Sequence, residues 1–298
     1  LAPGASEWEQ VAHAYEGNSD KQWADVDVAT GDVYIVTRDL KQGAEHSEEL
    51  VKTSDGGASW QHVAYFDAID FAQIAVRPGG HIYLAGLSTG QGPATVIALE
   101  SHDGGATWGE PVTIAELVLG FTNQPVGTGA STKLYRTPPL PAIAAADGVP
   151  RIAVAYFDDA GNGDWDVFVR VSQDGGATWG EPVKVADDAS GADQWTPAVA
   201  LSPRGDVHVT WFDARNDPTL GEGHLVDLYY GHSADGLAFD PSIRVTDDSF
   251  LPYLGRHQNQ PFFIGDYLGV QASDAGAVMI WPDTRTGESE VFAARVAG

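Results

Sequence analysis

Short stretches of alternating apolar and polar residues recur along the whole chain, in groups of three. Each group is followed by a Gly-rich turn and one more apolar stretch. Alternation with a period of two predicts β-strands with one buried face, and the intervening turn residues predict antiparallel neighbours. The predicted strands of the four complete groups are residues 24–29, 32–37, 49–53 and 61–66; 71–76, 81–86, 94–100 and 111–114; 142–146, 151–157, 166–171 and 182–185; and 197–201, 206–212, 227–231 and 242–245. A fifth group stops after residues 267–272, 278–281 and 290–295. The pattern therefore predicts an all-β fold built from four-stranded antiparallel units.

The turn between the third and fourth strands of each unit is a repeated octet. Residues 172–179 read Ser-Gln-Asp-Gly-Gly-Ala-Thr-Trp, and residues 53–60 and 101–108 are near copies. A shorter copy covers residues 233–239 and ends in Phe. The Asp carboxylate can accept hydrogen bonds from nearby backbone N–H groups, glycine tolerates positive φ, and the aromatic residue can anchor the next strand. We therefore interpret the octet as a structural turn.

The octet resembles the Asp-box of the sialidase superfamily of β-propellers. The resemblance implies a propeller with one four-stranded blade per group, and repeats of this length are typical of propeller blades. We expect a single domain over residues 1–298 with five blades. Residues 4–8 look like the end of a box and residues 9–15 like a fourth strand, so the N-terminal strand is expected to pair with residues 290–295 and complete the last blade, which removes a free sheet edge. Sialidases have six blades, and a degenerate sixth blade within residues 117–139 is the alternative.

Composition restricts the partners. The net charge of −26 repels nucleic acid and acidic membranes, so neither is expected to bind. No apolar run reaches membrane-spanning length. The chain has no Cys and therefore no disulfide. Its first residue is Leu1 rather than Met, so we expect a mature secreted protein, with a trimmed sequence as the alternative. We also expect a monomer.

Three long segments are expected opposite the boxes, at one rim of the propeller. They are residues 117–139, 213–226 and 246–265, and long loops gathered at one rim favour a walled cleft. The side chains expected in this cleft are Tyr135, Arg136, Asp158, Trp195, Asp213, Arg215, Tyr253, Arg256, His257, Asp266, Tyr267, Asp283 and Arg285. On the innermost strands, Asp25, Gln73, Ala142, Ala198 and Gly269 are expected at one equivalent position, with Asp25 and Gln73 nearest the central axis.

The sialidase resemblance implies Arg side chains on a sugar carboxylate, a Tyr nucleophile and an Asp that transfers the proton. Carried over, Tyr267 and Asp266 become the catalytic candidates, and the substrate-binding candidates are Arg136, Arg215, Arg256, Arg285, Tyr135, Trp195, His257, Asp25, Asp213 and Asp283. The chain departs from the family in one motif: the Arg-Ile-Pro string that precedes the first box in sialidases has its nearest counterpart in residues 135–139, after the second box. The leading hypothesis is an exo-acting, sialidase-like glycoside hydrolase that binds a glycan. The alternatives are a non-catalytic propeller that binds carbohydrate or protein, and a polysaccharide lyase that uses Tyr and His against a uronate.

Two sets of polar residues have a second interpretation. The Asp-x-Arg strings at residues 213–215 and 283–285 repeat at one place in successive groups, so they are either cleft residues or ion pairs between blades. The acidic loop at residues 158–166 is either a solvated surface loop or a structural Ca²⁺ site that uses Asp158, Asp159, Asn162 and Asp164. No other cofactor is expected to be required, because the sequence contains no zinc-ligand spacing, phosphate loop or nucleophile elbow.

Overall fold

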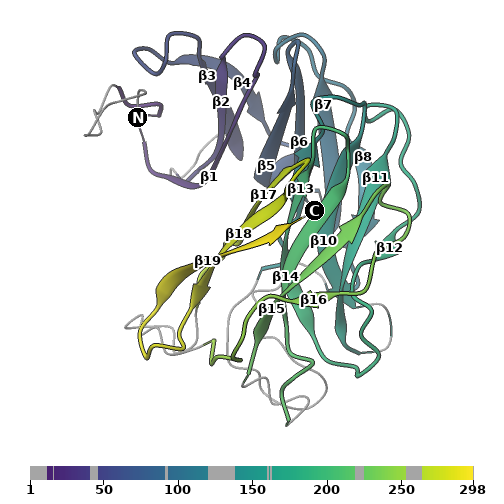
Figure 1. The fold of residues 1–298 in the computed structure, drawn as a ribbon. Coiled ribbons are helices and arrows are strands. Elements are labelled where there is room, and N and C mark those ends of the chain that lie inside the picture. Colours follow the sequence, from purple (N-terminus) through teal and green to yellow (C-terminus); the bar gives the residue numbers. More distant parts are fainter. Residues whose placement is uncertain are drawn as a thin grey trace.

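The structure is a computed structural model, and it describes residues 12–15, 17–40, 46–90, 93–119, 138–159, 161, 163–218, 225–252 and 264–297. In these ranges the chain is all-β (Figure 1). The nineteen strands found there form five antiparallel sheets. None of the described residues forms a helix that is long and apolar enough to cross a membrane.

Four of the sheets contain four strands each, paired in chain order. The first sheet consists of β1 (Ser19–Val26), β2 (Val33–Asp39), β3 (Glu48–Thr53) and β4 (Gln61–Phe66). The second consists of β5 (Ile69–Arg77), β6 (His81–Ser88), β7 (Thr95–Ser101) and β8 (Val112–Glu116). The third consists of β9 (Ala142–Ala145), β10 (Ile152–Asp159), β11 (Trp165–Ser172) and β12 (Val183–Lys184). The fourth consists of β13 (Gln194–Leu201), β14 (Val207–Asp213), β15 (Asp227–Ser233) and β16 (Ile243–Arg244).

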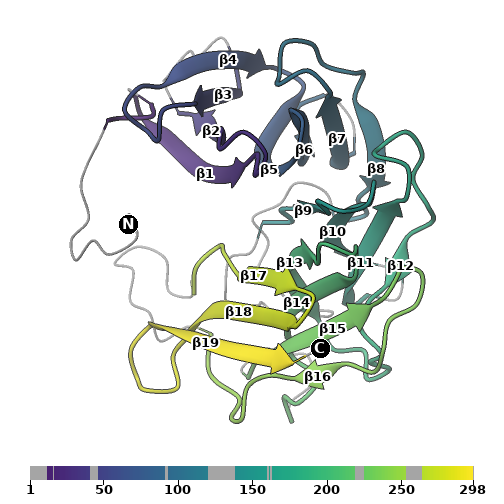
Figure 2. The same ribbon diagram turned by 45° about the horizontal axis from the view of Figure 1, so that its top comes forward.

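The fifth sheet has three strands among the described residues. They are β17 (Gly269–Ser273), β18 (Gly276–Asp283) and β19 (Glu290–Ala297). Figure 2 shows the five sheets around a common centre, with β1, β5, β9, β13 and β17 innermost. All five of these strands line one central hollow. This arrangement is consistent with the predicted β-propeller.

The predicted closing strand is not seen. Residues 9–11 lie outside the described ranges, and residues 12–15 are described but do not form a strand. Ala14 and Tyr15 line a hollow together with β3 and β4 of the first sheet. The pairing of residues 9–15 with β19, and with it the blade count, stays a prediction. The six-blade alternative also stays open, because residues 120–137 are not described.

The octets form the tight turns expected of them. In residues 172–179 the Ser172 hydroxyl donates to Asp174 Oδ1 (2.9 Å), the Thr178 hydroxyl donates to Asp174 Oδ2 (2.6 Å), and the Gly176 N–H donates to the Ser172 hydroxyl oxygen (2.8 Å). Gly175 and Gly176 have φ of 78° and 100°, a region that favours glycine. The same bonds recur in residues 53–59 and 101–107. The side chains of the octet therefore hold the turn.

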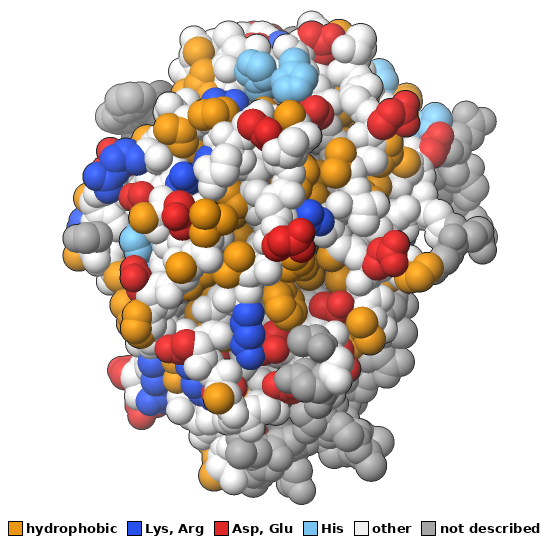
Figure 3. Space-filling model, turned by 90° about the vertical axis from the view of Figure 1, so that its right-hand side faces the viewer, with side chains coloured by type: hydrophobic (Ala, Val, Ile, Leu, Met, Phe, Trp, Pro, Cys, Tyr) orange, Lys and Arg blue, Asp and Glu red, His pale blue; other side chains and the backbone are white. Residues whose placement is uncertain are grey.

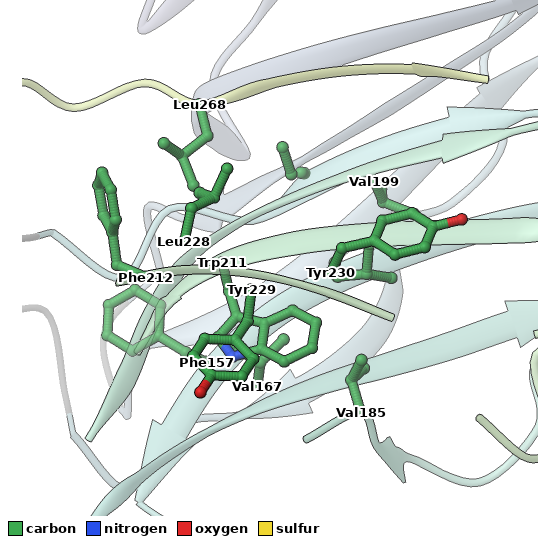
Figure 4. Close-up of a cluster of buried hydrophobic side chains, with 14 of the residues drawn as sticks. Phe157, Val167, Val185, Val199, Trp211, Phe212, Leu228, Tyr229, Tyr230 and Leu268 are labelled. Carbon is green, nitrogen blue, oxygen red and sulfur yellow. The ribbon is translucent and has the colours of Figure 1, made fainter. Parts of the chain in front are cut away.

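Apolar side chains fill the spaces between neighbouring sheets. The largest cluster joins the third, fourth and fifth sheets, and Figure 4 shows Phe157, Trp211, Phe212 and Leu268 among its members. Two smaller clusters join the first sheet to the second and the second to the third. The second, third and fourth sheets therefore each pack against two neighbours, and β14, at the middle of the largest cluster, is buried along its whole length.

Candidate functional site

The central hollow is the first part of the candidate site. It has a volume of about 410 Å³, within the range of small-molecule pockets. Its polar lining comes from Asp25, Gln73, Asp147 and Gln271, and Trp23 supplies an indole ring. Carboxylates and amides bind sugar hydroxyl groups, and an aromatic ring offers an apolar face to a sugar. The lining is therefore suited to a polar, uncharged ligand such as a sugar.

Asp25 lies in this hollow, as expected from the sequence, but not at the predicted register. A bulge between Asp20 and Trp23 places Trp23 opposite Val36, so Trp23 occupies the position that Gln73 holds in the second sheet. The pKa of Asp25 is raised, and the main cause is its burial. The negative charge of Asp147 also raises this pKa. The Val76 and Val26 N–H groups, which donate to the Asp25 carboxylate at 2.7 and 2.8 Å, lower it in part.

The seam between the first and fifth sheets is the second part of the site. Here the Lys21 ammonium forms an ion pair with the Asp266 carboxylate, and both side chains are almost completely buried. The Lys21 Nζ also lies 4.6 Å from the centre of the Tyr267 ring, and the Trp23 ring meets that ring edge to face at 5.6 Å. Tyr267 remains 45% exposed. Trp23 contacts Tyr267 and also lines the hollow, so its ring belongs to both parts of the site.

Lys21 occupies an unusual backbone position that recurs in other sheets. Lys21, Phe71 and Thr196 have φ of 55°, 56° and 48°, and each lies in a bulge of an innermost strand. In the first two sheets an Asp precedes this residue and accepts its N–H: Asp20 from Lys21 (2.9 Å) and Asp70 from Phe71 (3.0 Å). A side chain of the preceding sheet, Arg38, then binds Asp70 at 2.6 and 3.0 Å.

Asp266 and Tyr267 lie three and two residues before Gly269, the first paired residue of β17. Asp70 and Phe71 lie three and two residues before Gln73, the first paired residue after the bulge in β5. An Asp three residues before the corresponding paired residue thus recurs in the first, second and fifth sheets, as Asp20, Asp70 and Asp266. An Asp at this position binds a cation of another sheet, because Asp70 binds Arg38 and Asp266 binds Lys21. Asp266 thus has a structural role, and the catalytic roles assigned to Asp266 and Tyr267 from the resemblance stay predictions.

The Asp-x-Arg strings form ion pairs rather than a cluster of free guanidinium groups. The Asp213 carboxylate accepts hydrogen bonds from Trp211 Nε1 (2.9 Å) and from Arg215 Nε and Nη2 (3.0 and 2.8 Å). Arg215 Nη1 donates to Asp187, which lies between the third and fourth sheets, at 2.9 Å. The other string is built in the same way: Asp283 binds Trp281 and Arg285, and Arg285 also binds Asp247.

Asp213 and Asp283 are completely buried, so neither reaches a ligand. The placement of these two acids in the cleft is therefore corrected. Among the two interpretations of the Asp-x-Arg strings, the structure favours ion pairs between blades. Arg215 and Arg285 keep exposed fractions of only 14% and 18%, with their guanidinium groups already bound to carboxylates.

The prediction that Trp195 lies in the cleft is also corrected. Its side chain is 1% exposed and packs in the largest apolar cluster, with its ring 6.0 Å from that of Phe212. An apolar ring in an innermost strand is buried when the neighbouring sheet packs against it, and the sequence pattern alone does not distinguish that case from a cleft residue. Trp195 therefore belongs to the core rather than to a substrate surface.

The other predicted site residues fall outside the described ranges. These are Tyr135, Arg136, Tyr253, Arg256 and His257, together with Asn162 of the predicted calcium loop. Of the remaining loop residues, Asp158 accepts the N–H groups of Val118 and Leu119, both at 3.0 Å, and Asp159 accepts those of Gly161 and Gly163 at 2.7 and 3.1 Å. In the part of the chain that is described, these acids do not converge on a common point. The calcium site stays a prediction.

Sequence reasoning missed Lys21, Trp23 and Gln271. Lys21 and Trp23 precede the first predicted strand, and a bulge changes which face each residue occupies, so no alternation marks them. Gln271 fits the period-two alternation of β17, and this alternation is the sequence signal that could have placed it in the hollow. Away from the hollow, acidic side chains are scattered over the molecular surface, as Figure 3 shows for one face, so the net negative charge is spread rather than concentrated at one site.

No protein-family model and no curated protein matches this sequence. Solved structures do match. An α-L-arabinanase of Penicillium chrysogenum, in complex with arabinobiose, shares 16% identity at a TM-score of 0.60, covering 93% of this chain and 77% of the other. A GH93 α-L-arabinofuranosidase of Fusarium graminearum, also with arabinobiose, shares 14% identity at a TM-score of 0.57, covering 94% and 93%. A protein of unknown function from Dyadobacter fermentans shares 16% at 0.54, covering 94% and 79%. At this level of identity the likeness concerns the fold, and it is a likeness to β-propeller glycosidases.

Proposed function

We propose that this protein is a glycan-active hydrolase that binds a neutral oligosaccharide in the central hollow and at the adjoining seam. The observation that carries the proposal is the lining of the hollow, which combines the polar side chains of Asp25, Gln73 and Gln271 with the Trp23 ring. Protein sites for uncharged sugars combine such polar groups with an aromatic face. The half-exposed Tyr267 ring extends this surface at the seam.

A neutral sugar is preferred to a sialoside because of the state of the arginines. A sugar carboxylate calls for guanidinium groups that are free to bind it bidentately. Of the four arginines predicted to bind substrate, the structure describes Arg215 and Arg285, and each of these two is bound to two carboxylates. The proposal therefore moves from sialosides to neutral glycans. Arabinobiose is the first ligand to test, since it is bound in two enzymes that share the fold.

Catalysis is assigned to Asp266 and Tyr267 as part of the proposal. The Lys21 ammonium holds the Asp266 carboxylate in place beside the Tyr267 ring. In this position the Asp266 carboxylate would take a proton from the water that attacks the anomeric carbon, and the Tyr267 hydroxyl would bind the glycosidic oxygen and donate a proton to it as the bond to the leaving sugar breaks. The proton on Asp266 would then return to Tyr267 through solvent.

The second candidate function is non-catalytic glycan binding. The observation in its favour is that Asp266 and Asp70 both brace neighbouring sheets. A carboxylate that holds two sheets together can be explained without chemistry. The hollow and the aromatic rings would then serve recognition alone.

One experiment separates these functions. The full chain is incubated with arabinobiose, longer arabino-oligosaccharides, sialosides and uronate-containing oligosaccharides, while released sugars are measured by chromatography and binding by calorimetry. We expect turnover of a neutral oligosaccharide that falls at least 100-fold in Tyr267→Phe and in Asp266→Asn, and binding that weakens about 10-fold in Trp23→Ala. Tyr65→Phe, which alters an exposed Tyr on β4 of the first sheet, is the control. Binding without turnover, unchanged in Tyr267→Phe, would support the binding protein, and the absence of binding to every neutral sugar would contradict both.

A further inference from the structure

A second pocket is lined by residues of the fourth and fifth sheets. It lies at the end of the fourth sheet where the octet turn joins β15 to β16. Its volume is about 310 Å³. The residues that matter come from the β13–β14 turn (Asp206), from β14 (His208), from β15 (Tyr230 and His232) and from the segment after the octet (Asp240). This pocket is separate from the central hollow and shares no lining residue with it.

Three potential metal ligands meet at this pocket. A carboxylate oxygen of Asp206 and one ring nitrogen each of His208 and His232 lie within 4.8 Å of one another. Two ligands at about 2.0 Å from a tetrahedral zinc are about 3.3 Å apart, so small rotations of these side chains bring them into coordination distance. Elsewhere in the described residues no other group of three His, Cys, Asp or Glu side chains converges in this way.

Both histidines have their Nδ1 atoms engaged, which leaves Nε2 for a ligand. His232 Nδ1 lies 2.7 Å from the Asp240 carboxylate, and His208 Nδ1 lies 2.7 Å from the Tyr230 hydroxyl oxygen. In metal sites, a carboxylate or another acceptor on the second nitrogen fixes the tautomer and orients the ring. Asp240 and Tyr230 occupy these orienting positions.

His208 provides an independent indication of a missing ligand. The residue is 3% exposed, and its Nε2 atom is buried without a hydrogen-bond partner among the described residues. A buried polar atom without a partner destabilises the folded state, so such atoms call for an explanation. A metal ion bound to Nε2 would satisfy this atom.

The histidine pair is not a consequence of the repeated fold. His208 on β14 pairs with His232 on β15, and His232 directly precedes Ser233, the first residue of the octet. The pairs at the same register in the first three sheets are Tyr34 with Lys52, Tyr83 with Glu100, and Ala153 with Val171. Residues that serve the fold recur from sheet to sheet, as the Asp-x-Arg strings do. Among the four sheets compared at this register, the fourth sheet is the one in which two histidines face each other with an acid beside them.

We propose that Asp206, His208 and His232 bind a divalent transition-metal ion, with Zn²⁺ as the preferred ion. Two imidazoles and one carboxylate suit zinc, and the pocket leaves a fourth position for water. The ligands were not recognisable from spacing in the sequence because they come from two facing strands and the preceding turn. The ion would tie β14 to β15 near Arg204, which pairs with Asp274 of the fifth sheet at 3.3 Å.

The test is zinc binding by the full chain after treatment with a chelator. Calorimetry should give one Zn²⁺ per chain and thermal unfolding should shift upward with zinc. Co²⁺ should produce the visible absorption of a tetrahedral nitrogen–oxygen site. His232→Gln and Asp206→Asn should each abolish or weaken binding at least 10-fold, and Asp240→Asn should weaken it about 10- to 100-fold by releasing the His232 ring.

The matched control is His102→Gln. His102 belongs to another pair of neighbouring histidines, with its Nδ1 2.8 Å from His81 Nδ1, but both rings are exposed enough to reach water. This variant should bind zinc as the parent does. His208 is left unchanged because its substitution in the core endangers folding. Failure of the parent chain to bind zinc, or unchanged binding by His232→Gln, would overturn the proposal.

Discussion

Asp213 shows how a single buried side chain can organise its surroundings. Its carboxylate receives the Trp211 indole, the Arg215 guanidinium and the Arg215 backbone N–H, all at 2.8–3.0 Å. Asp213→Ala would leave the Arg215 charge and the Trp211 N–H without this acceptor inside the protein. Removing one partner of a buried ion pair typically costs about 3–5 kcal/mol. We expect a loss of that size in the free energy of unfolding, measured by urea denaturation.

The control for this change is Arg204→Ala. Arg204 forms surface ion pairs and its side chain is 63% exposed, so its loss should change the free energy of unfolding by no more than about 1 kcal/mol. If Asp213→Ala were as mild as Arg204→Ala, the Asp-x-Arg strings would not be structural, and their assignment to a ligand site would regain support.

At the scale of the element, the octet turn links stability to pH. The pKa of Asp103 is lowered to about 2, mainly because the Thr107 hydroxyl and N–H donate to its carboxylate. The pKa of Asp55 is lowered to about 2 by the same two groups of Ser59. A carboxyl group with a lowered pKa stabilises the folded state above its unfolded pKa of about 3.9, and this contribution is lost as the pH falls towards 2. Asp103→Asn should therefore unfold at lower urea than the parent at pH 7, with the difference shrinking by pH 2.5. A difference that is constant with pH would show that the ionised carboxylate is not the stabilising form.

The elements were largely predictable from the sequence because they rest on local physics. Alternation located the strands, and Asp with paired glycines located the turns, since both signals depend on neighbouring residues only. The bulge at Lys21 was not predictable, because one extra residue in a strand has no marker in the alternation. It displaced the expected register in β1 and brought Trp23 to the position expected for Asp25.

The candidate site was less predictable than the fold. The Asp-x-Arg strings were recognised as repeats, which is why ion pairing was a stated alternative. Whether a side chain such as Trp195 faces a cleft or a neighbouring sheet depends on packing between segments far apart in the sequence. The same holds for Lys21 and Asp266, which are 245 residues apart, and for the two histidines of the proposed zinc site, which face each other across strands.

At the scale of the whole molecule, the fifth sheet ends in an edge strand, β19. β19 pairs with β18 on one side, and in the described residues no strand covers its other side. Val291 on this strand is 78% exposed. A long edge strand with exposed apolar residues tends to pair with another chain, and proteins usually cover or charge such an edge. For this physical reason the pairing of residues 9–15 with residues 290–295 stays a prediction, although residues 12–15 are described and do not form a strand.

Deletion of residues 1–11 tests this closure. If these residues cover β19, the shortened chain should unfold at lower temperature and should associate through the bared edge, which size-exclusion chromatography over a range of concentrations detects. Val291→Lys in the shortened chain should suppress the association without restoring the lost stability, because a charge blocks pairing of edges but supplies no strand. A shortened chain that stays monomeric and melts with the parent would show that residues 1–11 do not close the ring. The contacts of Lys21 and Trp23 with Asp266 and Tyr267 would then be the described links between the first and fifth sheets.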